Sequence, residues 1–96
     1  MLTRLNIIKE IQALKPELVE KYHVTRIGLF GSFANGNPGE GSDIDILIDF
    51  EKPIGWDFFK IEKMFEDRFN RKIDLITPSA LKPLFKKNIL NNIIEL

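Results

Sequence analysis

Residues 26–50 read RIGLFGSFANGNPGEGSDIDILIDF. The first five residues are a short apolar run that ends at Gly31-Ser32, which is typical of a strand entering a tight turn. Residues 35–41 hold the densest group of glycine and proline in the chain and predict a loop. Residues 43–50 alternate strictly and form the clearest predicted strand. Its aspartates and Leu47 point to one face, and its isoleucines and Phe50 point to the other.

The rest of the chain supplies helices around a third strand. Apolar spacing predicts a helix over residues 3–14, capped by Thr3, and Pro16 begins a second, short helix over 16–22. We expect a further helix over 56–69, a strand over 72–76 and a last helix over 83–94. The residues that suit the buried side of this last helix are Leu84, Phe85, Ile89, Ile93 and Ile94.

This order of elements predicts an α+β fold. We expect a small mixed β-sheet with helices packed on one face, and the polar residues of the second strand on the other face. A length of 96 residues is enough for one core but not for two, so we expect a single domain over residues 1–96.

Composition narrows the function classes. The formal net charge is zero and there is no cysteine, so neither broad nucleic-acid binding nor a disulfide framework is expected. The N-terminal residues do not resemble a signal peptide, and no apolar run reaches the length of a membrane helix. We therefore expect a soluble, cytoplasmic protein that binds neither a membrane nor nucleic acid directly.

Asp43 and Asp45 are the first candidate site residues. Their side chains leave the same face of a strand, with α-carbons roughly 6.5 Å apart. Two carboxylates this close repel each other, so one takes up a proton or a cation sits between them, and Mg²⁺ suits such oxygen ligands. Asp74 joins them if its strand neighbours theirs, and three carboxylates suit a two-metal site. The alternative is that they are ordinary solvent-facing residues, which is how we interpret Asp49.

Gly31 and Ser32 are the second candidate feature. Glycine allows close backbone approach to a ligand, and a serine hydroxyl can donate a hydrogen bond to phosphate. A plain strand-to-helix turn remains the alternative. The sequence is neither a P-loop nor a dinucleotide fingerprint. A Gly-Ser turn followed by carboxylates on two strands favours phosphoryl or nucleotidyl transfer.

The segment GSFANGNPGEGSDIDILI resembles the signature of the DNA polymerase β-like nucleotidyltransferase superfamily. The resemblance is to its minimal single-domain members, which show GS-x-A-R-G, a short loop and then S-D-I-D-L, and it extends over most of the chain. It implies a polymerase β-like nucleotidyltransferase fold and catalysis by Asp43, Asp45 and Asp74 with two Mg²⁺ ions. It also implies that Gly31 and Ser32, assisted by Ser42, hold the triphosphate of ATP or another NTP.

One position departs from that pattern, because Asn35 stands where the family usually has arginine. The departure puts tight NTP binding in doubt; the cations at Arg68, Arg71 and Lys72 could replace the missing charge or could simply be solvated.

The resemblance further implies a partner. Many minimal members act as antitoxins of a HEPN-family toxin, some by adding AMP to a tyrosine hydroxyl of that toxin. We therefore expect transfer of AMP from ATP to such a partner, within a homo- or hetero-oligomer. The alternatives are a weak or inactive module that neutralises its toxin by contact alone, and a nucleotidyltransferase acting on a small molecule.

Overall fold

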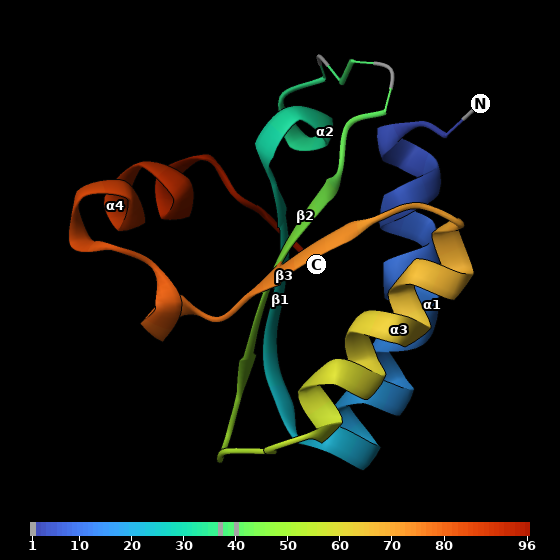
Figure 1. Ribbon diagram of the computed structural model, residues 1–96, viewed down its shortest axis with the longest axis vertical. Helices are drawn as coiled ribbons and strands as arrows, with labels where there is room; N and C mark the ends of the chain where they lie inside the picture. Colours follow the sequence, from blue (N-terminus) through green and yellow to red (C-terminus); the bar gives the residue numbers. More distant parts are fainter. Residues whose placement is uncertain (1, 37, 40) are drawn as a thin grey trace.

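The computed structural model describes residues 2–36, 38–39 and 41–96, and these form a four-stranded mixed sheet with helices on both sides (Figure 1). In chain order the elements are α1 (Arg4–Tyr22), β1 (Val24–Phe30), α2 (Gly31–Asn35), β2 (Ile44–Phe50), α3 (Asp57–Phe69), β3 (Ile73–Ile76), the 3₁₀ turn η1 (Pro78–Ala80), α4 (Pro83–Asn92) and β4 (Ile94–Glu95). The predicted α+β class is confirmed. In the described part of the chain, no helix combines the length and the apolar character needed to cross a bilayer.

Helix α1 is one continuous helix, and the prediction of a break at Pro16 was wrong. Thr3 caps its start by accepting a hydrogen bond from the Asn6 N–H at 3.2 Å, as expected. Pro16 lies on the exposed side, while Ile11 and Leu18 on either side of it are fully buried. Burial of those two side chains offsets the backbone hydrogen bond that proline removes.

The sheet has the strand order β3-β2-β1-β4. Strand β2 runs antiparallel to β1 and parallel to β3, so the second and third predicted strands are neighbours, which is the condition for Asp74 to join the carboxylates of β2. Strand β4, which the sequence did not predict, pairs with the free edge of β1. The chain end is held there because the Leu96 N–H donates to the Ile27 carbonyl at 2.9 Å, and Lys15 Nζ donates to the Leu96 carbonyl at 2.6 Å.

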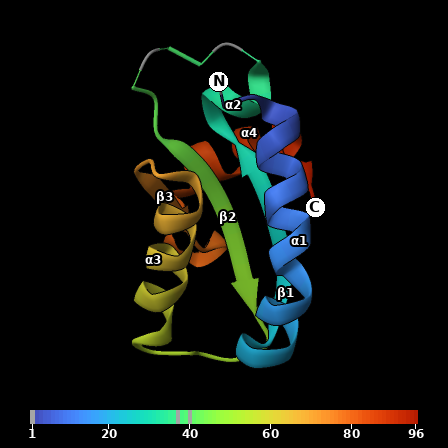
Figure 2. The same cartoon turned by 90° about the vertical axis from the view of Figure 1, so that its right-hand side faces the viewer.

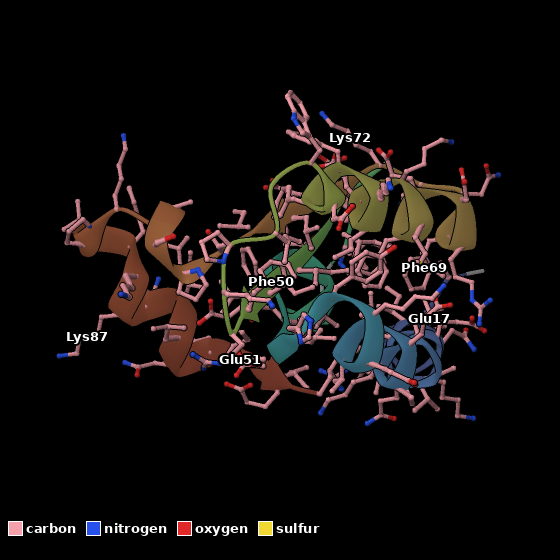
Figure 3. The ribbon with its side chains drawn as sticks, turned by 90° about the horizontal axis from the view of Figure 1, so that it is seen from below. Glu17, Phe50, Glu51, Phe69, Lys72 and Lys87 are labelled. Carbon is pink, nitrogen blue, oxygen red and sulfur yellow. The ribbon has the colours of Figure 1, made fainter. Side chains whose placement is uncertain are left out.

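Helices α1 and α3 cover one face of the sheet, as Figures 1 and 2 show from two sides. The isoleucines of β2 are fully buried on this face, against Ile7 and Ile11 of α1 and Ile61 and Phe65 of α3. The helix predicted over residues 56–69 is confirmed as α3, and its Ile61, Phe65 and Phe69 are all buried. Phe69 lies between α3 and α1 when the molecule is seen from below (Figure 3). This packing fixes the side of the sheet to which the aspartates of β2 must point.

Helix α4 lies on the opposite side of the sheet, so not all helices share one face (Figure 1). Leu84 and Phe85, expected on its buried side, are 82% and 54% exposed, and that prediction was wrong. No residue of α4 is buried. The segment instead meets the sheet just after the helix, where the Ile93 side chain lies so close to Gly28 that a Cβ there would be 2.2 Å from Ile93 Cδ1.

Replacing Gly28 by valine should destabilise the fold, because the new side chain would occupy the space that Ile93 fills. Forcing extra atoms into a packed site typically costs about 1–3 kcal/mol. Urea denaturation of G28V measures the loss, and Thr25→Val at an exposed position of β1 is the control. An unchanged free energy of unfolding in G28V would show that Ile93 is not held against the sheet.

Candidate active site

Asp45 and Asp74 are direct partners on neighbouring strands. The parallel register of β2 and β3 pairs Asp45 with Asp74, just as it pairs Ile44 with Ile73. Side chains of paired residues leave the same face of a sheet. Two carboxylates that are 29 positions apart in the sequence therefore lie side by side. The condition under which Asp74 joins Asp45, that their strands are neighbours, is met.

The electrostatics of this pair are unfavourable for two ionised carboxylates. Partial burial, followed by repulsion from Asp74, a hydrogen bond with Asp74 and repulsion from Asp43, together raise the pKa of Asp45 to about 6. Near neutral pH the site therefore carries more negative charge than its surroundings stabilise. A hard divalent cation with oxygen ligands would relieve that repulsion, so the donor set at Asp45 and Asp74 fits Mg²⁺.

Gly31 presses directly against the Asp45 carboxylate. Its φ is +75°, and a Cβ built there would lie 2.0 Å from Asp45 Oδ2. Only glycine meets both demands without strain, because it tolerates the left-handed region and leaves room for the carboxylate. The register of β1 with β2 places Phe30, the preceding residue, opposite Asp45. The predicted Gly-Ser turn and the predicted carboxylates thus belong to one site.

Asp43 lies at the edge of this pair. It is close enough to act on the charge of Asp45, but its Oδ2 lies 4.0 Å from Lys72 Nζ. Across residues 2–36, 38–39 and 41–96, no three His, Cys, Asp or Glu side chains are grouped in a way that could hold a metal ion. The structure therefore brings Asp45 and Asp74 together, and the role of Asp43 in a three-carboxylate site stays a prediction. Asp49 lies further along β2, where its Oδ1 accepts the Phe50 N–H at 2.9 Å.

Arginines near the site hold backbone rather than face a ligand. Arg71 Nη1 donates to the Ser42 carbonyl at 2.9 Å, and its guanidinium lies 5.4 Å from the centre of the Phe33 ring. Arg71 thereby ties the end of the glycine-rich loop to α2. The predicted loop over 35–41 includes positions 37 and 40, which lie outside the described residues. Ser32 is half-buried on α2, and Ser42 is half-buried beside Asp43.

Arg4 was missed by the sequence interpretation. Its Nη1 donates to the Ala34 carbonyl at 3.1 Å, so α1 holds the last turn of α2 next to Asn35. No local pattern could indicate a contact across 30 positions. Arg68, considered as a replacement cation, instead forms an ion pair with Glu10 on α1.

Comparison with known proteins places this chain in a family. The chain matches the nucleotidyltransferase domain family over residues 11–96. It belongs to that family. It is 38% identical over 95 residues to Protein adenylyltransferase MntA of Thermococcus cleftensis, covering 98% of this chain and 96% of that protein. It is 43% identical over 90 residues, 91% of this chain and 92% of the other, to a protein of Methanocaldococcus jannaschii provisionally named a protein adenylyltransferase.

Solved structures confirm the fold of this nucleotidyltransferase domain. A structure provisionally named a minimal nucleotidyltransferase superposes with a TM-score of 0.83 at 24% identity, covering 99% of this chain and 97% of that one. A toxin–antitoxin structure with AMP-PNP superposes with a TM-score of 0.73 at 19% identity, covering 94% of this chain and 71% of that one. The predicted family resemblance is therefore confirmed, and the protein is a nucleotidyltransferase.

The pKa of Asp45 makes the stability of the nucleotidyltransferase domain depend on pH. The folded chain holds a proton on Asp45 up to about pH 6, against 3.8 for the ordinary carboxyl, so stability present below pH 3.8 is lost as pH rises through 6. Without Mg²⁺, Asp45→Asn should therefore be more stable than wild type at pH 7.5. Two pKa units correspond to about 3 kcal/mol, and solvent screening at this half-exposed side chain reduces the expected gain to about 1 kcal/mol.

Thermal denaturation at pH 4 and pH 7.5 measures this difference. At pH 4 the two proteins should be nearly equal in stability, because wild-type Asp45 is then neutral. Asp49→Asn, on the same strand but away from the pair, is the control. A gain that is the same at both pH values would contradict the assignment to Asp45.

Gly31→Ala should impair nucleotidyl transfer by displacing the Asp45 carboxylate. A non-glycine residue at this φ costs about 1–3 kcal/mol by itself, so the matched control is Gly41→Ala, which has a φ of +78° and open space around it. Both variants should lose stability in denaturation, but only G31A should lose transfer activity, by at least about tenfold. Equal activity in the two variants would show that the contact with Asp45 does not matter.

Proposed function

We propose that this chain transfers AMP from ATP to a tyrosine hydroxyl of a HEPN-family toxin, depends on Mg²⁺, and acts as the antitoxin of that toxin in the cytoplasm. The observation that carries the chemistry is the pairing of Asp45 with Asp74 beside Gly31. The family supports nucleotidyl transfer. The relative from Thermococcus cleftensis is named a protein adenylyltransferase, which supports a protein acceptor.

In the proposed reaction, the acceptor oxygen attacks the α-phosphorus of ATP. The bond from the α-phosphorus to the bridging oxygen of the β-phosphate breaks, pyrophosphate leaves, and AMP becomes esterified to the acceptor. The hydroxyl proton passes to the carboxylate of Asp74, and the exposure of this residue on the strand next to Asp45 supports that role. Gly31 lets the phosphates approach the backbone at the end of β1, and Ser32 and Ser42 offer hydroxyl donors.

Asp45 and Asp74, with Asp43 at their edge, would hold Mg²⁺. When bound, this ion would neutralise the charge that develops on the phosphates and polarise the α-phosphoryl group. Asp43 can join the carboxylates if Lys72 releases it, and their present separation of 4.0 Å makes that ion pair a weak one. Two ions, as the resemblance implies, would need all three carboxylates.

The acceptor side of the reaction is assigned to the partner. The site lies on a sheet face of which α4 covers only a part, and Asp74 is exposed. A toxin tyrosine could therefore reach the carboxylates from outside. Structures of toxin–antitoxin complexes share this fold, which supports assembly with such a partner.

The test is incubation of the chain with the purified HEPN-family partner, Mg²⁺ and ATP labelled at the α-phosphate. Wild type should label the partner. Asp45→Asn and Asp74→Asn should each label it at least about 100-fold more slowly, the scale of losing one preorganised electrostatic contact in a transition state. Asp49→Asn removes an equal charge from the same strand and should label normally. Absence of label with wild type would reject the transfer.

The same variants separate catalysis from neutralisation by contact alone. If Asp45→Asn still folds, binds the partner and protects cells from it as well as wild type does, then contact is sufficient and the contact-only function is correct. Label on small molecules but not on the partner would instead support the small-molecule alternative.

A further inference from the structure

A groove opens between the end of β1 and the second half of α4. It has a volume of about 490 Å³ and is lined by Phe30, Gly31, Asn35, Asn88, Ile89 and Asn92. Ligand sites for small molecules typically measure about 300–1,000 Å³. The groove lies on the same sheet face as the carboxylate pair, because α4 is the helix on that face (Figure 1).

None of the lining residues carries a charge. The polar groups are three side-chain amides and the backbone of Gly31, and the apolar walls are Phe30 and Ile89. A triphosphate in this groove would leave the water that solvates its charges and meet no cation in return, which is unfavourable. A neutral ligand with a flat apolar face and a hydrogen-bonding edge suits the lining much better.

The groove adjoins the carboxylate site at Phe30 and Gly31. Gly31 touches the Asp45 carboxylate, and Phe30 is paired with Asp45 across the sheet. A ligand that spans both places would need a neutral half in the groove and an anionic half at the cation-binding carboxylates. A nucleoside triphosphate has these two halves, because its nucleoside is neutral and its triphosphate is anionic.

We propose that the groove binds the nucleoside of ATP and that Asn88 and Asn92 of α4 hydrogen-bond the edge of its base. This inference rests on the proposed nucleotidyl transfer and adds the site that recognises the nucleoside. It also gives a role to α4, a helix whose side chains are not needed to fill the core.

The side chains of Asn88 and Asn92 are joined to each other on α4. Asn92 Nδ2 donates to the Asn88 carbonyl at 2.8 Å and to Asn88 Oδ1 at 2.9 Å. Because residues four apart share one helix face, their side chains stand together. The arrangement leaves the Asn88 amide nitrogen as a donor and the Asn92 amide oxygen as an acceptor. A base edge presents a matching acceptor and donor, and asparagine reads adenine by such a pair of bonds in DNA recognition.

Phe30 and Ile89 supply the apolar contacts that the base face requires. Stacking or packing of a base on such side chains adds to hydrogen bonding at its edge. Lys87, one residue from Asn88 in α4, points away from the sheet in Figure 3 and does not line the groove. The groove therefore stays neutral although α4 carries basic residues.

Calorimetric titration with ATP and with inorganic tripolyphosphate, each with Mg²⁺, tests the inference. Wild type should bind ATP at least about tenfold more tightly than tripolyphosphate, because the nucleoside adds contacts. The double variant N88A/N92A should bind ATP about tenfold more weakly, the loss expected for two hydrogen bonds, and should bind tripolyphosphate as wild type does. Asn91→Ala, on the same helix but outside the groove, should bind both as wild type does.

The possible failures are distinguishable. Unchanged ATP binding in N88A/N92A, or equal binding of ATP and tripolyphosphate by wild type, would overturn the groove assignment and leave the proposed transfer intact. Binding of neither compound by wild type would overturn the proposed transfer together with the groove. Circular dichroism should show the native spectrum in every variant, since Asn88, Asn91 and Asn92 are exposed.

Discussion

The parallel pairing of β2 with β3 brings two carboxylates side by side, and the rest of the structure holds them there against their repulsion. The isoleucines of β2 are buried on the opposite face. A slip of one residue in that strand would bury the aspartates and expose the isoleucines, so the hydrophobic core fixes the register on which the site depends. Gly31 then confines the Asp45 carboxylate from the side. The repulsion between these carboxylates appears in the pKa of Asp45, which burial and the neighbouring Asp74 and Asp43 raise to about 6.

Much of this arrangement could be predicted because its signals are local. Alternation along β2 predicts directly the sheet face to which Asp45 points. The short apolar strand around Asp74 likewise predicts that Asp74 points away from the core, because its neighbours Ile73 and Leu75 are apolar. The Thr3 cap and the helix face containing Ile61 and Phe65 follow from spacing alone. The pairing of β2 with β3 needed one assumption, that strands close in sequence are neighbours, and here the assumption holds.

The features that could not be predicted depend on contacts between distant residues. Strand β4 has two residues, too few for any periodicity, and exists because the edge of β1 is free. The apolar residues Leu84 and Phe85 look like core residues in sequence but are exposed, because this segment meets the sheet at Ile93, just after α4, and not along the helix. The hydrogen bond from Arg4 to the Ala34 carbonyl likewise forms only when α1 packs beside α2. The groove beside Asn88 forms only when α4 lies next to the end of β1.

The presence of Asn35 where related sequences usually have arginine can be explained by the contacts around it. Arg4 and Arg71 both lie near the Gly-Ser turn, but each donates to a backbone carbonyl, at Ala34 and Ser42. These hydrogen bonds tie α2 and the end of its loop to α1 and to Arg71, so the donors are engaged with backbone. In the proposed reaction, positive charge at the phosphates would then come mainly from the cation at Asp45 and Asp74. The neutral amide of Asn35 lies instead in the groove proposed for the nucleoside, where an arginine would add a charge that the base does not need.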